Sequence, residues 1–318
     1  MLEALGAIGP LFGVLAVGVC AGLAPRLRAA EPALTAFVLY FALPAFLFGA
    51  VAGAPVKDGV PWAFAAIAFG VTALVAALTA GVAWLAGGRA RAYAAPLALA
   101  AGYGNVGYLG VPITLSILGP DSGLAAAMGQ LVHNVMFMAG YPLTALAARG
   151  PGRPSLGRLA WLAAKKALLA NPITLSIAAG AAVALAGAPL PKVAAATVGL
   201  FGQTAVPLAM FAVGLTLPSA VRGIREGAVP VLPLVCGAAV KTVVLPLATA
   251  AAILLVSPAL GGPWAPALIL MAAMPTSATA FVLSRQKDRD PRIVSGMIAS
   301  SSAVSVVTIP AAAALFVT

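Results

Sequence analysis

The segment Gly102-Tyr103-Gly104-Asn105-Val106-Gly107-Tyr108-Leu109-Gly110-Val111-Pro112 lies inside an apolar stretch long enough to cross a membrane, yet it is rich in helix-weakening residues. Each glycine costs about 1 kcal/mol relative to alanine in a helix interior. Pro112 lacks a backbone N–H and crowds the carbonyl of Tyr108, four residues earlier. In a bilayer, backbone groups freed from a helix are tolerated only where protein or a water-filled cavity satisfies them. The segment therefore predicts a broken helix, and Asn105 within it indicates a solute site.

The composition of the whole chain is that of a polytopic membrane protein. Of its 318 residues, 62% are hydrophobic and 8% are charged, and the mean hydropathy is +1.08. The net charge of +11 does not indicate nucleic-acid binding, because the basic residues fall in short loops between apolar runs. Cys20 and Cys236 both lie in apolar runs, so we expect them to be buried and not disulfide-bonded.

Ten apolar segments are long enough to be transmembrane helices. They are residues 5–25, 33–53, 61–86, 93–118, 123–148, 167–188, 193–217, 229–256, 264–285 and 291–316. Fifteen of the 18 basic residues lie in the loops after odd-numbered segments, against two, Lys57 and Lys192, in the other loops. The positive-inside rule therefore predicts that the odd-numbered loops are cytoplasmic and that both termini face outward.

Prolines recur between the two halves at a nearly constant offset. Pro10 matches Pro172 at an offset of 162, and Pro44 matches Pro207 and Pro112 matches Pro275 at 163. Because the unit contains five segments, an odd number, its second copy would be inverted, as in secondary transporters. The predicted fold is all-α, with ten transmembrane helices in two inverted five-helix repeats, residues 1–148 and 167–318, joined by a cytoplasmic linker at 149–166.

The broken segment supplies the first candidate binding residues. The Asn105 amide both donates and accepts hydrogen bonds, which suits a carboxylate or a bound cation. A half-helix beginning near Pro112 would direct the positive end of its dipole at an anion. The alternative is a structural kink in which the asparagine replaces lost backbone bonds. The candidate residues here are Gly104, Asn105, Pro112 and Thr114, and in the second copy Pro275, Thr276 and Ser277. The hydroxyls of Thr276 and Ser277 could instead bond carbonyls of their own helix.

Three more candidates lie in other segments. Lys241 is well inside segment eight, and an ionisable residue within the membrane is a functional hypothesis by default. It could attract an anionic substrate, or it could only bond carbonyls freed near Pro246. His133 and Asn134, early in segment five, could relay protons or could simply satisfy neighbouring backbone.

The acidic residues limit the mechanism. All seven are at segment ends or in loops, so proton exchange through a buried carboxylate pair is not expected. We find no serine–histidine–acid set, metal-binding cluster or nucleotide-binding glycine pattern, and so predict no enzymatic activity, no cofactor and no metal. Coupling to sodium or to protons stays open.

Three motifs, in order along the chain, resemble signatures of the auxin efflux carrier family. They are Gly104 to Pro112; Pro207-Leu208-Ala209-Met210-Phe211 with Gly214; and Ala273-Met274-Pro275 through Val282, followed by Asp290-Pro291-Arg292. That family includes the plant PIN auxin exporters and bacterial malonate or malate carriers, and shares a fold with bile-acid sodium symporters and sodium/proton antiporters. The chain is similar to its short prokaryotic members, since it lacks the long cytoplasmic loop of the plant proteins. This resemblance implies a bacterial cytoplasmic (inner) membrane, with both termini facing the periplasm.

The resemblance implies a scaffold from residues 1–53 and 167–217, often dimeric, and a transport domain from 61–148 and 229–318. Broken helices in segments four and nine would cross at their prolines, and an elevator-like movement would carry the substrate. We therefore expect a secondary active transporter of a small organic anion, a monocarboxylate or dicarboxylate, in contact with membrane lipid and not nucleic acid, and dimeric through its scaffold. The alternatives are a sodium-coupled importer of a bulkier amphipathic anion and a non-transporting membrane sensor.

Overall fold

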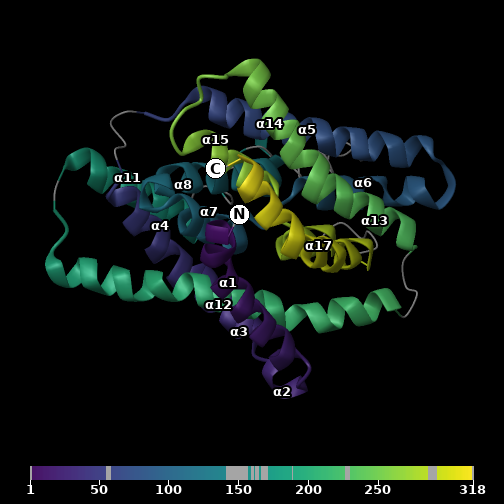
Figure 1. Ribbon diagram of the computed structural model, residues 1–318, viewed down its shortest axis with the longest axis horizontal. Coiled ribbons are helices and arrows are strands. Elements are labelled where there is room, and N and C mark those ends of the chain that lie inside the picture. The colour runs from purple at the N-terminus through teal and green to yellow at the C-terminus, as the bar shows by residue number, and fades with distance from the viewer. Residues whose placement is uncertain are drawn as a thin grey trace.

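The structure is a computed structural model that describes residues 2–54, 59–140, 157–158, 161, 165, 171–187, 189–225, 230–285 and 292–316. In these residues the chain is all-helical apart from turns and one isolated β-bridge, as the composition predicted (Figure 1). Most of the predicted linker, 149–166, and residues 141–148 of the fifth segment lie outside the described residues.

Each of the ten predicted segments contains helix. The first half comprises α1 (Leu2–Gly22), α2 (Pro25–Arg28), α3 (Glu31–Phe37), η1 (Val38–Ala42), α4 (Leu43–Ala52), α5 (Trp62–Leu85), α6 (Gly88–Gly102), η3 (Val106–Gly110), α7 (Val111–Leu118), η4 (Pro120–Ser122), α8 (Gly123–Asn134) and η5 (Val135–Gly140). The second half comprises α11 (Pro172–Ala186), α12 (Lys192–Arg225), α13 (Val231–Ala239), η7 (Val240–Val244), α14 (Leu245–Val256), α15 (Trp264–Ala272), α16 (Ala278–Arg285) and α17 (Arg292–Phe316).

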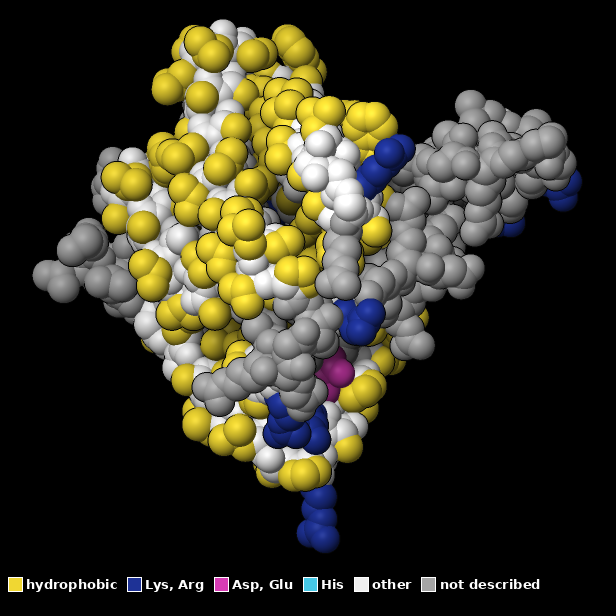
Figure 2. Space-filling view, turned by 90° about the vertical axis from the view of Figure 1, so that its right-hand side faces the viewer, with side chains coloured by type: hydrophobic (Ala, Val, Ile, Leu, Met, Phe, Trp, Pro, Cys, Tyr) yellow, Lys and Arg dark blue, Asp and Glu magenta, His cyan; other side chains and the backbone are white. Residues whose placement is uncertain are grey.

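The chain is a membrane protein by the length and polarity of its helices. Five helical stretches of the described residues are long and apolar enough to span a bilayer: Pro25–Ala52, Trp62–Leu85, Lys192–Ser219, Val231–Val256 and Arg292–Phe316. Apolar side chains cover much of the face shown in Figure 2. Large apolar side chains with high exposure include Leu85 and Leu255, which are 78% and 84% exposed. Such a surface is unusual for a soluble monomer and is expected where helices face lipid. The expectation that Cys20 and Cys236 are buried is wrong: both are free and exposed on this apolar surface, where a small thiol costs little.

Three π-helical turns end two residues before a proline that lies within the described residues. They are η1 before Pro44, η3 before Pro112 and η7 before Pro246. In each, the N–H of the residue preceding the proline bonds a carbonyl five residues earlier, as from Val111 to Val106. The wider turn moves the carbonyl that the proline ring would otherwise crowd. Pro112 therefore does not end a helix, and the expectation that a half-helix begins near it is wrong.

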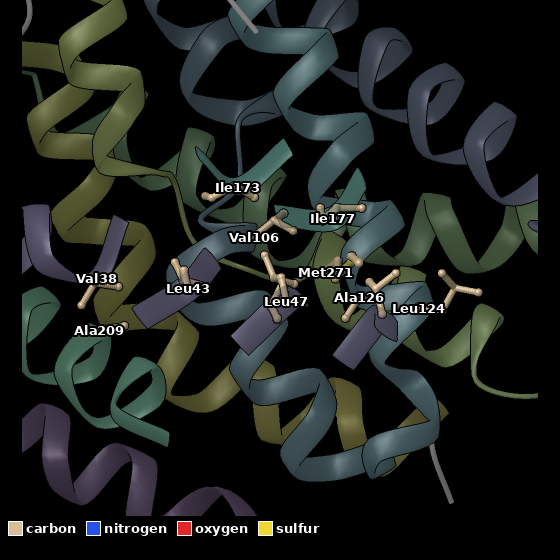
Figure 3. Packing of buried hydrophobic residues seen from close by; sticks show 13 residues of the cluster. Val38, Leu43, Leu47, Val106, Leu124, Ala126, Ile173, Ile177, Ala209 and Met271 are labelled. Carbon is tan, nitrogen blue, oxygen red and sulfur yellow. The ribbon is translucent and has the colours of Figure 1, made fainter. Parts of the chain in front are cut away.

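A buried apolar cluster connects elements from both halves of the chain. Figure 3 shows side chains of η1, α4, η3, α8, α11 and α15 converging there, among them Val38, Leu43, Leu47, Val106, Leu124, Ile173, Ile177 and Met271. On another side, α1 packs along α12 at glycines (Figure 1). A Cβ built on Gly18 would lie 2.5 Å from the carbonyl oxygen of Phe211, so this close approach requires a glycine.

Candidate functional site

Two helix interruptions meet in the middle of the molecule. One is residues 103–105, between α6 and η3, and the other is residues 273–277, between α15 and α16. Asn105 donates its backbone N–H to the carbonyl of Pro275 at 2.7 Å, Ser277 donates to the carbonyl of Tyr103 at 2.9 Å, and Gly104 and Thr276 form an antiparallel β-bridge. Each interruption therefore supplies the hydrogen bonds that the other has lost, which an apolar membrane interior requires.

Side chains strengthen this junction. The Thr276 hydroxyl donates to the carbonyl of Ala100 at 2.8 Å, and the Thr276 backbone N–H donates to the Ser301 hydroxyl at 3.0 Å. Ala100 lies in the last turn of α6, where carbonyls run out of donors within the helix. Thr276, predicted as a substrate ligand, is only 1% exposed and holds α6, α17 and the second interruption together.

The first interruption, residues 103–105, ends seven residues before Pro112. The first half therefore meets the second at residues 103–105 and not at Pro112. In the second half, Pro275 does take part in the crossing, through its carbonyl. The proline offset of 163 also pairs Asn105 with Leu268, but Leu268 lies inside α15, before the second interruption. A proline that a π turn accommodates does not mark where a helix breaks. The offset aligned such a proline, Pro112, with Pro275, which does lie at a break.

Lys241 lies directly behind the crossing. It is fully buried in η7, and its ammonium donates to the carbonyl of Ala272, the last residue of α15, at 2.9 Å. A cation is favoured at a helix C-terminus, where unpaired carbonyls gather. A Cβ built on Gly104 would lie 3.0 Å from the Lys241 Nζ atom, so a glycine here lets the ammonium approach the first interruption closely.

A pocket of about 650 Å³ opens beside the crossing. Its lining combines the two interruptions with α3, η1, η3, α8, α11, α12, α16 and α17. The lining residues are Glu31, Thr35, Leu39, Tyr103, Gly104, Asn105, Gly107, Tyr108, Gln130, Asn134, Asn171, Ile173, Thr216, Ser219, Ser277, Ala278, Thr279, Phe281, Ser295 and Ile298. Within the described part of the chain, Glu31 is the one formally charged side chain of this lining. This volume is in the usual range for small-molecule sites.

Three buried amide side chains line this pocket with unused hydrogen-bonding capacity. Asn105, Gln130 and Asn134 are 5%, 6% and 2% exposed, so water does not readily satisfy them. Gln130 donates from Nε2 to Oδ1 of Asn134 at 2.8 Å, one turn further along α8. The Asn105 Oδ1, Gln130 Oε1 and Asn134 Nδ2 atoms have no partner within the described residues. A buried polar group without a partner costs about 1–3 kcal/mol, so this arrangement indicates a place for a polar ligand.

The structure brings together only part of the predicted site. Gly104, Asn105, Asn134 and Ser277 line the pocket, whereas Pro275, Thr276 and Lys241 pack behind it. The other three predicted residues, Pro112, Thr114 and His133, are buried and do not line it. The ring of His133 instead lies 5.9 Å from that of Phe137, centroid to centroid.

Sequence reasoning missed several residues of the pocket, of which Gln130, Glu31 and Asn171 are the most polar. Gln130 could have been found from its position four residues before Asn134, which places both on one helical face. Asn171 precedes Pro172 at the start of α11, and its side chain accepts the N–H of Ile173 at 2.9 Å. That cap is a local signal, but its place beside the crossing depends on contacts distant in sequence.

Comparison with known proteins agrees with the motifs and the fold. A profile of a family described as "Membrane transport protein" matches residues 5–153 and 157–312. A protein of Rhizobium meliloti (strain 1021) named "Putative malonate transporter" is 28% identical over 316 residues, covering 97% of this chain and 94% of that protein. The chain therefore belongs to the membrane transport protein family, the auxin efflux carrier family that its motifs resemble.

Proposed function

We propose that this protein is a secondary carrier that moves a small organic anion, a monocarboxylate or dicarboxylate, and that the pocket beside the crossing binds the substrate. The observation that carries the proposal is a pocket at the meeting point of two broken helices, in which buried amide atoms have no partner among the residues that the structure describes. Broken helices near the middle of a membrane protein are the usual place for a carrier's substrate.

The electrostatics of the crossing favour an anion. Both η3, which continues into α7, and α16 begin at the pocket, at Val106 and Ala278. A helix N-terminus carries about half a positive charge, which suits a carboxylate. At α16 the N–H groups of Thr279 and Ala280 are bonded to the hydroxyl and the carbonyl of Ser277, so this end would act mainly through its dipole. Lys241 adds a buried cation behind Gly104. Glu31, in contrast, is a negative group on the same pocket, so the carboxylate of the substrate would lie on the opposite side, at the helix ends.

The relative named as a malonate transporter supports a dicarboxylate as the first substrate class to test. The size of the pocket supports a second candidate, because a three-carbon diacid fills only a small part of about 650 Å³. Leu39, Ile173, Phe281 and Ile298 give the pocket an apolar wall. A bulkier amphipathic anion would bury its apolar part there, about 25 cal/mol of favourable free energy for each Å² removed from water.

Alternating access by an elevator movement is part of the same proposal, with ten helices in two inverted repeats. Apolar contacts support such a movement. The cluster around Leu43, Val106 and Ile177 joins the expected scaffold to the expected transport domain without a salt bridge or side-chain hydrogen bond among its members. An interface of this kind can slide without breaking directional bonds. The loop charges support termini that face outward in a bacterial cytoplasmic membrane. A sodium or proton gradient would drive the cycle, and the scaffold would form a homodimer.

Uptake into proteoliposomes tests the function. Purified protein is given a panel of radiolabelled anions: a diacid, an arylacetic acid and a bile acid, each with and without sodium and proton gradients. We expect saturable uptake of at least one, lost in Asn105→Ala and Asn105→Asp and retained in Gln203→Ala, which alters an exposed amide on α12. Saturable binding without uptake would instead identify a sensor. Uptake that survives both Asn105 substitutions would refute the assignment of the pocket.

A further inference from the structure

The polar groups of the pocket do not suit a ligand that only accepts hydrogen bonds. Gln130 and Asn134 are bonded to each other, which leaves one acceptor, Gln130 Oε1, and one donor, Asn134 Nδ2. If both amides rotate by 180°, the bond between them is kept and the free donor and acceptor exchange places. In either arrangement the pair keeps one unpaired donor and one unpaired acceptor. A fully ionised carboxylate has no donor, so it would leave the acceptor buried and unpaired.

The charges around the pocket also oppose a second full negative charge on the ligand. Of the described residues that line it, the formally charged one is Glu31, which is negative. The nearby cation is Lys241, whose ammonium is already directed at the Ala272 carbonyl. The positive charge of one buried cation and two helix N-termini is enough to balance one carboxylate. A second carboxylate would be placed among amides and near Glu31, where a buried charge without a partner is costly.

We propose that the pocket selects dicarboxylic acids in their half-protonated form, as monoanions. The ionised carboxylate would bind at the N-termini of η3 and α16. The protonated carboxyl group would reach the Gln130–Asn134 pair, donating its hydrogen to the free acceptor and accepting from the free donor. This inference rests on the proposed function and specifies which ionic form of the substrate is bound.

The fit at the pair depends on Gly107. A Cβ built on Gly107 would lie 3.1 Å from Gln130 Oε1, tighter than ordinary contact, so the glycine lets the Gln130 amide lie against η3 beside Asn105. The two recognition points, helix ends and amide pair, therefore belong to one pocket. The geometry explains why a carrier for diacids would have amides, and not arginines, at its second recognition point.

The test separates titration of the ligand from titration of the protein. The titratable or charged groups around the pair, in the part of the chain that the structure describes, are Glu31 on α3, Tyr103 at the first interruption, Tyr108 on η3, His133 on α8 and Lys241 on η7. Malonate and its monoamide, malonamate, are compared on purified wild-type protein by equilibrium binding over a range of pH. The monoamide keeps one carboxylate and has a permanent donor and acceptor in place of the protonated carboxyl group, so its own charge does not change over this range.

We expect the affinity for malonate to fall about tenfold per pH unit once pH exceeds the second ionisation of malonic acid, since only the monoanion binds. Affinity for malonamate should stay constant over the same range. An affinity for malonate that stays constant, or that changes with pH in parallel with that for malonamate, would overturn the proposal. Binding of malonate but not malonamate above the second ionisation would overturn it as well.

A variant locates the effect at the pair. In Gln130→Met, which keeps the length of the side chain but not its polar atoms, binding of malonamate should weaken about tenfold. Binding of propionate, which has a single carboxylate, should change less than twofold, and Gln203→Met on α12 serves as the matched control. Equal weakening of both ligands would overturn the proposal. If uptake of dicarboxylates persists while the pH profiles fail, only this inference falls; if no organic anion is taken up, the proposed function falls with it.

Discussion

The junction between the two interruptions can be tested at one hydroxyl group, that of Thr276. Valine has nearly the shape of threonine but cannot donate a hydrogen bond, so Thr276→Val removes the 2.8 Å bond to the Ala100 carbonyl and little else. Thr276→Ser keeps the hydroxyl and is the matched control. The residue is 1% exposed, so water does not replace the lost donor.

The magnitude follows from the position of Ala100. Hydrogen bonds between helices in membrane proteins contribute about 0.6 kcal/mol on average, because the unfolded chain finds other partners. Ala100, however, lies in the last turn of α6, where no further helical donor follows, and is itself buried. Its carbonyl would be left unpaired, which costs about 1–3 kcal/mol. We therefore expect Thr276→Val to lower the free energy of unfolding by about 1–3 kcal/mol, and Thr276→Ser by less.

Denaturant unfolding in lipid–detergent bicelles measures this difference. A double-mutant cycle with Ser301→Ala adds information, because the Ser301 hydroxyl accepts the backbone N–H of the same residue. The two changes should be non-additive, since both act on one segment of backbone. If Thr276→Val and Thr276→Ser have the same unfolding free energy, or if the cycle is additive, the junction is not held by these side chains and our description of it is wrong.

Three further substitutions have clear expectations. Lys241→Met removes the cation behind Gly104, so the anion affinity measured by equilibrium binding should fall about tenfold or more, which is about 1.4 kcal/mol. Lys192→Met, which alters an exposed lysine, should leave the affinity unchanged. Equal affinities of the Lys241→Met variant and the unchanged protein would exclude a role for the charge. Gly107→Ala would push the Gln130 amide out of place and should weaken anion binding several-fold in a folded protein. Gly199→Ala, at a position with open space around it, should leave binding unchanged. Unchanged binding in Gly107→Ala would contradict the contact with Gln130. Pro112→Ala restores an N–H donor and should let the π turn of η3 revert to an α-turn. Because this change shifts the side chains of Val106–Gly110, uptake should drop more than in Pro10→Ala. Equal uptake in the two variants would show that the π turn does not matter for transport.

Local chemistry was enough to predict an all-helical membrane protein and the position of the first interruption. The apolar runs have the length of transmembrane helices. Gly104 next to Asn105 marks a place where neither a continuous helix nor contact with lipid is favourable for the chain. The same reasoning failed at Pro112, because a proline can be accommodated by a wider turn without ending the helix, and sequence does not show which of these occurs.

The pocket was harder to predict than the fold. Asn105 and Ser277 were recognised because they lie at breaks, but Glu31, Gln130 and Asn171 are brought to the crossing only by packing of distant helices. Thr276 and Lys241 were expected to contact substrate, and the structure instead has them bonded to helix carbonyls, because those carbonyls need donors in an apolar interior. A polar residue in a membrane helix can therefore serve a freed backbone as readily as a ligand, and the sequence alone does not distinguish the two.

The central claim, that the substrate binds in the pocket beside the crossing, is tested most directly by protection from labelling. In a chain whose Cys20 and Cys236 are replaced by serine, Ser277→Cys places a thiol in the pocket, and Val193→Cys, on the exposed face of α12, is the control. A water-soluble thiol reagent is applied to proteoliposomes with increasing concentrations of a transported anion. We predict that the anion slows labelling of Ser277→Cys at least tenfold, with a midpoint equal to its transport constant, and leaves Val193→Cys unaffected. Labelling of Ser277→Cys at the same rate with and without saturating anion would contradict the claim.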